Sequence, residues 1–118
     1  MTLRHNTLHC DTIANSNGGG CTADVSLFGD WAQVSNVLVE NNLLKASSSS
    51  GFCAYGGHQP AKPYPNSTGI QYRNNVFERG PNGKCGAYGP VTSFDPNAAG
   101  NVWTGNVWTD GAPVPSAD

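Results

Sequence analysis

The chain has 118 residues, enough for one compact domain and too few for two domains with separate cores. Charged residues make up only 12% of it, and its 15 Gly and 8 Pro favour turns and strands, which excludes an all-helical bundle. The net charge of -2 leaves no basic stripe, and no apolar run approaches the roughly 20 residues of a membrane helix, so we expect neither a nucleic-acid partner nor a membrane.

Four segments of the chain share one pattern when they are aligned without gaps. Its eight positions are apolar, any residue, apolar, polar, turn residue, Asn, small or apolar, and bulky apolar. The segments are residues 1–8 (MTLRHNTL), 37–44 (VLVENNLL), 70–77 (IQYRNNVF) and 101–108 (NVWTGNVW). The sixth position is always Asn: Asn6, Asn42, Asn75 and Asn106. Short strands that recur about every 30 residues around a fixed Asn predict a solenoid in which every repeat is one coil.

A second, weaker repeat lies between these segments. Residues 26–29 (SLFG), 53–56 (CAYG) and 86–89 (GAYG) each end in an aromatic residue followed by Gly, so we expect them to align as further strands. The run of serines at 47–50 predicts a solvated linker.

Strand alternation predicts which side chains of the eight-residue segments face inward. One inward column consists of Leu3, Val39, Tyr72 and Trp103, and another of Leu8, Leu44, Phe77 and Trp108. The outward positions between them are Arg4, Glu40, Arg73 and Thr104, and Lys45 lies one period before Glu78. Neighbours of opposite charge oppose register slips, although a merely solvated face explains the same residues.

The N-N-[LV]-[LF] and G-N-V-W segments resemble those of right-handed parallel β-helix proteins of the pectate-lyase-like type. More narrowly, the run CTADVSLFGDWAQVSNVLVENNLL, followed by YGG, KPYPN and CGAYGPV, is similar to β-helix proteins secreted by actinobacteria. The resemblance implies an all-β chain, a short right-handed parallel β-helix (solenoid) of about three to four coils with an Asn ladder along the stack. We expect residues 1–110 to form this single domain and residues 111–118 to form a tail that caps it.

Four cysteines in a small, turn-rich chain predict disulfides and secretion, and no signal peptide precedes the first segment, so we expect a mature or excised piece. No C-x2-C pair is present, so we expect no metal. We predict the pairs Cys10–Cys21, which closes a Gly-rich loop, and Cys53–Cys85, which joins neighbouring coils because their separation is close to one period. Cys21–Cys53 has the same separation as the second pair and is the main alternative.

Function in a solenoid is carried by its loops, and four are long enough here: residues 11–20, 30–36, 57–68 and 90–100. Asp30 and Trp31 could bind a sugar through a carboxylate and a stacked ring, while a turn-capping Asp and a half-buried Trp are the structural alternative. We predict that carbohydrate-binding residues come from the set Asp24, Asp30, Trp31, His58, Tyr64 and Asp95.

The residues do not decide whether the chain is an enzyme, and no catalytic residue is assigned. β-Helix hydrolases need clustered carboxylates, and lyases need Ca²⁺ ligands with a basic residue. We expect no cofactor, with Ca²⁺ as the one ion that such a lyase would use.

Two functions follow from the resemblance and the loops. The first is a secreted module that interacts with extracellular polysaccharide, as a fragment or non-catalytic relative of carbohydrate-active enzymes. The second is a structural or assembly scaffold that self-associates through its open solenoid ends, with the N-terminal end as the expected contact of a homo-oligomer.

Overall fold

The computed structural model describes residues 1–11, 21–47 and 50–116. The described residues form an all-β structure, as predicted, and contain no helix with the length and apolar character that a membrane span requires. Its strands are β1 (Thr2–Arg4), β2 (Thr7–Leu8), β3 (Val34–Glu40), β4 (Leu43–Leu44), β5 (Phe52–Tyr55), β6 (Ser67–Arg73), β7 (Val76–Phe77), β8 (Gly89–Thr92), β9 (Val102–Thr104) and β10 (Val107–Trp108).

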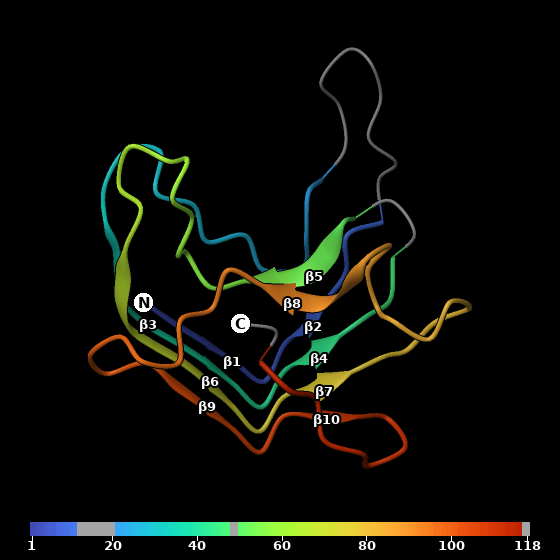
Figure 1. Cartoon of the computed structure of the whole chain (residues 1–118). Helices are drawn as coiled ribbons and strands as arrows, with labels where there is room; N and C mark the ends of the chain where they lie inside the picture. The colour runs from blue at the N-terminus through green and yellow to red at the C-terminus, as the bar shows by residue number, and fades with distance from the viewer. Residues whose placement is uncertain (12–20, 48–49, 117–118) are drawn as a thin grey trace, which may run out of the picture.

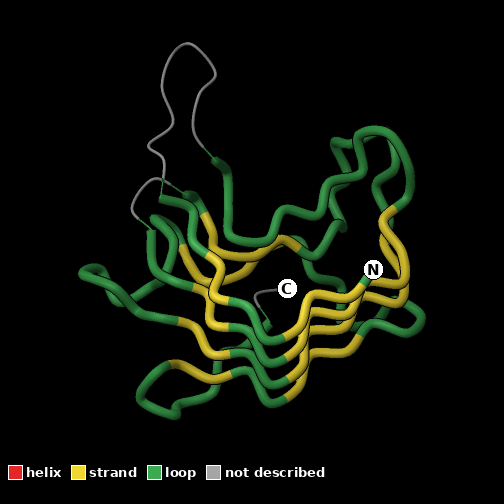
Figure 2. Tube along the Cα trace, turned by 180° about the vertical axis from the view of Figure 1, so that it is seen from behind, coloured by secondary structure: helices red, strands yellow, loops and turns green. Residues whose placement is uncertain are grey.

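The strands are arranged in three parallel sheets. One contains β1, β3, β6 and β9 in this order, the second contains β2, β4, β7 and β10, and the third pairs β5 with β8. Figure 1 shows the first two sheets meeting at a row of sharp bends, and Figure 2 shows from behind how successive passes of the chain lie on one another. Each strand therefore pairs with its equivalent in the next repeat.

The register of the first two sheets is the predicted one. Leu3 pairs with Val39, Val39 with Tyr72, and Tyr72 with Trp103. The second column follows in the same way through Leu8, Leu44, Phe77 and Trp108. The middle members of both columns are fully buried in one core, because alternation turns them inward and a neighbour covers them on each side.

A left-handed residue makes the bend between the two sheets in every segment. The fifth position has φ of 58° at His5, 53° at Asn41, 55° at Asn74 and 67° at Gly105. At Gly105 a Cβ would lie too close to the side-chain amide of Asn74, so Gly leaves room for that amide. The sharp bend brings the sixth-position Asn inward and lets it reach the equivalent residue of the next segment.

The four sixth-position residues, here called the asparagine row, are joined by side-chain hydrogen bonds. Asn42 Nδ2 donates to Asn75 Oδ1 at 3.2 Å, and Asn75 Nδ2 donates to Asn106 Oδ1 at 2.9 Å. The same oxygens accept the backbone N–H groups of Asn42 and Asn75. At the exposed end of the row, Asn6 Nδ2 donates to Asn42 Oδ1 at 3.3 Å. These bonds satisfy amides that burial would otherwise leave unpaired.

The predicted alignment of the weaker repeat is wrong. Val25, not Leu27, bridges to Ala54, and Ala54 pairs with Val91, not with Ala87. These three residues are buried at 4%, 0% and 0% exposure, whereas Tyr88, the expected aromatic of the last segment, is 76% exposed. The inward column needs small apolar side chains, so residues 26–29 and 86–89 are shifted relative to the expected frame.

Both predicted disulfides, Cys10–Cys21 and Cys53–Cys85, are confirmed. The serine run differs from its prediction as a solvated linker. Ser47 and Ser50 are buried, Ser47 N–H donates to Cys85 O at 2.9 Å, and Ser50 O accepts from Ala87 N–H at 2.8 Å. Ser48 and Ser49 lie outside the described residues. Ser47 and Ser50 are held because their backbone groups bond to the loop that carries Cys85.

The outward positions form part of the expected charge pattern. Arg4 Nε donates to Glu40 Oε2 at 2.8 Å, as predicted for neighbours of opposite sign. Arg73 instead donates to Gln71, and among the described residues no ion pair joins Lys45 to Glu78, whose carboxylate accepts the N–H of Ala46. Among the described residues, these outward positions therefore contribute one ion pair between neighbouring strands, Arg4–Glu40.

Candidate functional site

Two loops, residues 29–33 and 57–66, lie side by side at one edge of the molecule (Figures 1 and 2). Tyr64 N–H donates to Gly29 O at 2.9 Å. The Tyr64 carbonyl occupies the space that a side chain at residue 29 would need, so Gly29 permits this approach. Lys62 Nζ lies 3.0 Å from Asp30 Oδ1 and 5.1 Å from the centre of the Phe28 ring. The loops are thus joined by backbone, ionic and cation–π contacts.

This loop pair presents the most exposed aromatic side chain of the described residues. Trp31 is 92% exposed and Tyr64 is 44% exposed. Beside Tyr64 is a shallow hollow of about 110 Å³, lined by Gln33, Pro63, Tyr64, Pro65 and Asn66. We call Asp30, Trp31, Gln33, Lys62, Tyr64 and Asn66 the Trp31 surface. It combines flat apolar rings with amide, carboxylate and ammonium groups, which is the equipment for binding a polyhydroxylated ring.

The structure brings together three of the predicted residues, Asp30, Trp31 and Tyr64. His58, in the same loop, is half-buried, and its backbone N–H donates to Ser93 O at 2.9 Å. Asp95 Oδ1 accepts the N–H of Asn97, which makes it a turn-capping residue. For these two residues, the contacts shown are therefore structural.

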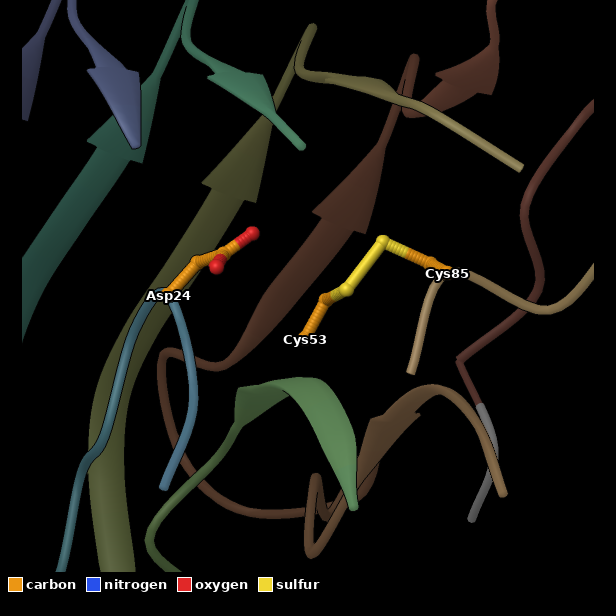
Figure 3. A group of neighbouring side chains, drawn as sticks. All are labelled: Asp24, Cys53 and Cys85. Carbon is orange, nitrogen blue, oxygen red and sulfur yellow. A yellow bond between two sulfur atoms is a disulfide. The ribbon is translucent and has the colours of Figure 1, made fainter. Parts of the chain in front are cut away.

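Asp24 lies away from the Trp31 surface and faces the Cys53–Cys85 disulfide in the interior (Figure 3). Its Oδ1 accepts the Cys10 N–H at 2.7 Å, and its Oδ2 is buried with no hydrogen-bond partner among the described residues. Burial raises the pKa of Asp24 to about 6, while the Cys10 hydrogen bond and the charge of His9 act in the opposite direction. Burial therefore disfavours the charged form of the Asp24 carboxyl group.

Asp24, Cys53 and Cys85 are the one group of described side chains whose spacing would suit a metal ion, with donor atoms within 4.8 Å of one another. Both sulfur atoms are joined in the disulfide. A cavity of about 250 Å³, lined by Ala46, Ser47, Pro81, Asn82 and Cys85, lies next to this bond. The two cysteines of this group therefore act here as a covalent cross-link of the core.

Three residues of the Trp31 surface are outside the set predicted from the sequence: Gln33, Lys62 and Asn66. The three prolines of the sequence GHQPAKPYPNST, which stiffen this loop and hold its side chains outward, already mark Lys62 beside His58 and Tyr64, and the same signal extends to Asn66. Gln33 gave no signal, because its place in the hollow depends on how the two loops meet.

Comparison of this chain with protein-family models, with curated proteins and with solved structures found no match to any of them.

Proposed function

We propose that the chain is a secreted, short right-handed parallel β-helix of three to four coils, of the pectate-lyase-like type, with the asparagine row as its ladder. Three parallel sheets, repeats spaced by 36, 33 and 31 residues and two disulfides support this proposal. Each pass of the chain would be one coil, and disulfides suit an oxidising extracellular compartment.

The function that we propose for this β-helix is binding of extracellular polysaccharide at the Trp31 surface. The observation that carries the proposal is the 92% exposure of Trp31 on two loops that are held together by the Asp30–Lys62 ion pair. An indole ring on rigid backbone stacks on a pyranose face at little entropic cost. A glycan stacked on this ring would remove its apolar faces from water.

The polar groups around the ring would recognise hydroxyls. Gln33 and Asn66 beside Tyr64 offer amides with both donors and acceptors, the pattern that vicinal hydroxyl groups need. Asp30 keeps its second oxygen for a hydroxyl while its first one holds Lys62. With its carboxylate paired in this way and Asp24 turned to the interior, the surface is equipped for binding, and we propose a non-catalytic relative of carbohydrate-active enzymes.

Affinity electrophoresis and pull-down with neutral and acidic polysaccharides, each with and without Ca²⁺, would test this function. We expect Trp31→Ala and Tyr64→Ala to weaken binding about three- to tenfold, the value of one lost ring contact. Tyr88→Ala is the matched control, because Tyr88 is an exposed aromatic outside both loops. Binding that Tyr88→Ala weakens as much as Trp31→Ala, or no binding to any polysaccharide, would refute the proposal.

A second candidate function is assembly through the N-terminal end. It is favoured by the edge positions of β1 and β2 in their sheets and by the half-buried state of Leu3 and Leu8. Exposed strand edges are templates for further pairing. Sedimentation at rising protein concentration would reveal a homo-oligomer by an increase in mass.

A further inference from the structure

The N-terminal edge consists of β1, β2 and the bend between them. Leu3 and Leu8 begin the two inward columns and are half-buried, while their neighbours Val39 and Leu44 are at 0% exposure. β1 and β2 are the end strands of their sheets among the described residues. Among the described residues, no strand covers the outer side of either apolar column at this edge.

The hydrogen bonds of the asparagine row change at the same edge. The Nδ2 of each later Asn donates to the carbonyl of the third residue in the preceding segment: Asn42 to Leu3 at 3.0 Å, Asn75 to Val39 at 2.9 Å, and Asn106 to Tyr72 at 2.9 Å. Asn6 Nδ2 turns instead to Arg4 O of its own segment at 3.0 Å. Asn6 thus has the donor that would engage a preceding segment.

The opposite end is closed by the chain itself. Val114 N–H donates to Asn106 O at 2.9 Å, as Val107 N–H donates to Asn75 O at 2.9 Å. Pro113 bridges to Val107, and the Trp103 indole N–H donates to Val114 O at 2.6 Å. Head-to-tail stacking of whole copies would have to displace this tail. Whatever covers the N-terminal edge therefore differs from the C-terminal end of another copy.

We propose that the N-terminal edge is a docking surface for one further strand–turn–strand unit with the chain's own eight-residue pattern, added in parallel. Its sixth-position Asn would donate to Asn6 Oδ1, and Asn6 Nδ2 would donate to the carbonyl of its third residue. A two-fold pair of copies would set β1 antiparallel to its mate and could not reproduce these bonds. The inference is independent of glycan binding at the Trp31 surface.

Charge specifies the fourth position of the docking unit. Arg4 is bonded to Glu40 at 2.8 Å, and its side chain keeps 50% exposure. An acidic residue on the other side of Arg4 would continue the alternation of sign across neighbouring strands. The segment of residues 37–44, VLVENNLL, has Glu at this position and Asn at the sixth, so a peptide of this sequence is the natural probe.

The experiment titrates the ¹⁵N-labelled full chain with this peptide, with lysines added after its last residue for solubility, up to about 1 mM. We expect the amide signals of Thr2, Arg4 and Asn6 and the Asn6 side-chain NH₂ signal to shift. Peptides with Asn42→Ala or Glu40→Lys should bind at least about tenfold more weakly. The Trp31→Ala chain should bind the peptide unchanged.

Three outcomes would overturn the inference: no shift at the highest concentration, shifts confined to residues 106–114, or equal binding of the Asn42→Ala peptide. Sedimentation of the same samples covers the remaining occupant. A dimer of the chain that the peptide fails to dissociate would assign the edge to a second copy and contradict the proposal.

Discussion

Val114 N–H donates to Asn106 O at 2.9 Å, in the position that a strand residue of a following segment would hold. Val114 is also 2% exposed and belongs to the core. The last segment is thus covered by a short irregular piece of chain, which makes the same backbone hydrogen bond that a further repeat would make.

We expect Val114→Ala to lower the free energy of unfolding by about 1 to 3 kcal/mol, because it removes buried methyl groups above the last segment. Chemical denaturation would measure the change. Pro115→Ala, at an exposed neighbouring position, is the control and should be close to wild type. Equal effects of the two substitutions would show that the tail does not cover the core.

Replacing Asn75 by Leu should lower the free energy of unfolding by about 1 to 3 kcal/mol. The backbone N–H and the Nδ2 of Asn42 both donate to Asn75 Oδ1, and both would lose this buried acceptor. The free energy of unfolding from denaturant titration gives the value. Asn6→Leu is the matched control and should cost less, because Asn6 is exposed at the end of the row. Wild-type stability of the Asn75 variant would contradict the role of the row.

Asp24 should make the protein more stable at mildly acidic pH. Its pKa is about 6 in the folded chain against an ordinary value of 3.8, so the folded state binds the proton more tightly. This contribution is fully present below about pH 4 and is lost as the pH rises through 6. After allowance for solvent screening it amounts to about 1 kcal/mol. Thermal unfolding between pH 4 and 8 would measure it, with Asp24→Asn as the comparison. Parallel pH profiles of the two proteins would exclude this assignment.

The two disulfides should contribute unequally. Cys53–Cys85 closes a separation of 32 residues and Cys10–Cys21 one of 11. Loop-closure entropy predicts about 4 kcal/mol for the longer loop and about 3 kcal/mol for the shorter one. Unfolding of the two double-alanine variants would compare them. A larger loss of stability on removing Cys10–Cys21 than on removing Cys53–Cys85 would show that unfolded-state entropy is not the main contribution.

Leu3→Lys tests the second candidate function. It places a charge in the first inward column at the N-terminal edge, so any homo-oligomer formed there should dissociate to monomers with the fold retained. Sedimentation and circular dichroism would follow mass and fold. Thr109→Lys, at an exposed position near the closed end, is the control. A wild-type chain that stays monomeric at high concentration would remove this function.

The sequence by itself was enough to predict the repeat, the inward columns and the disulfide pairs. Strand alternation has a fixed period of two, so one alignment on the sixth-position Asn places Leu3, Val39, Tyr72 and Trp103 in register. The bend at the fifth position and the Asn at the sixth recur in all four segments, so each segment by itself indicates where its strands begin and end.

Only the tertiary structure decided how the unequal connections between these segments lie. The pairings of Val25 with Ala54 and of Ala54 with Val91, the burial of Ser47 and Ser50, and the orientation of Asp24 toward the disulfide have no period in the sequence. The Trp31 surface likewise depends on Lys62 reaching Asp30 from another loop, 32 residues along the chain. Loops of different length carry no common register, so their contacts are set by which side chains can fill or leave the core once the sheets have formed.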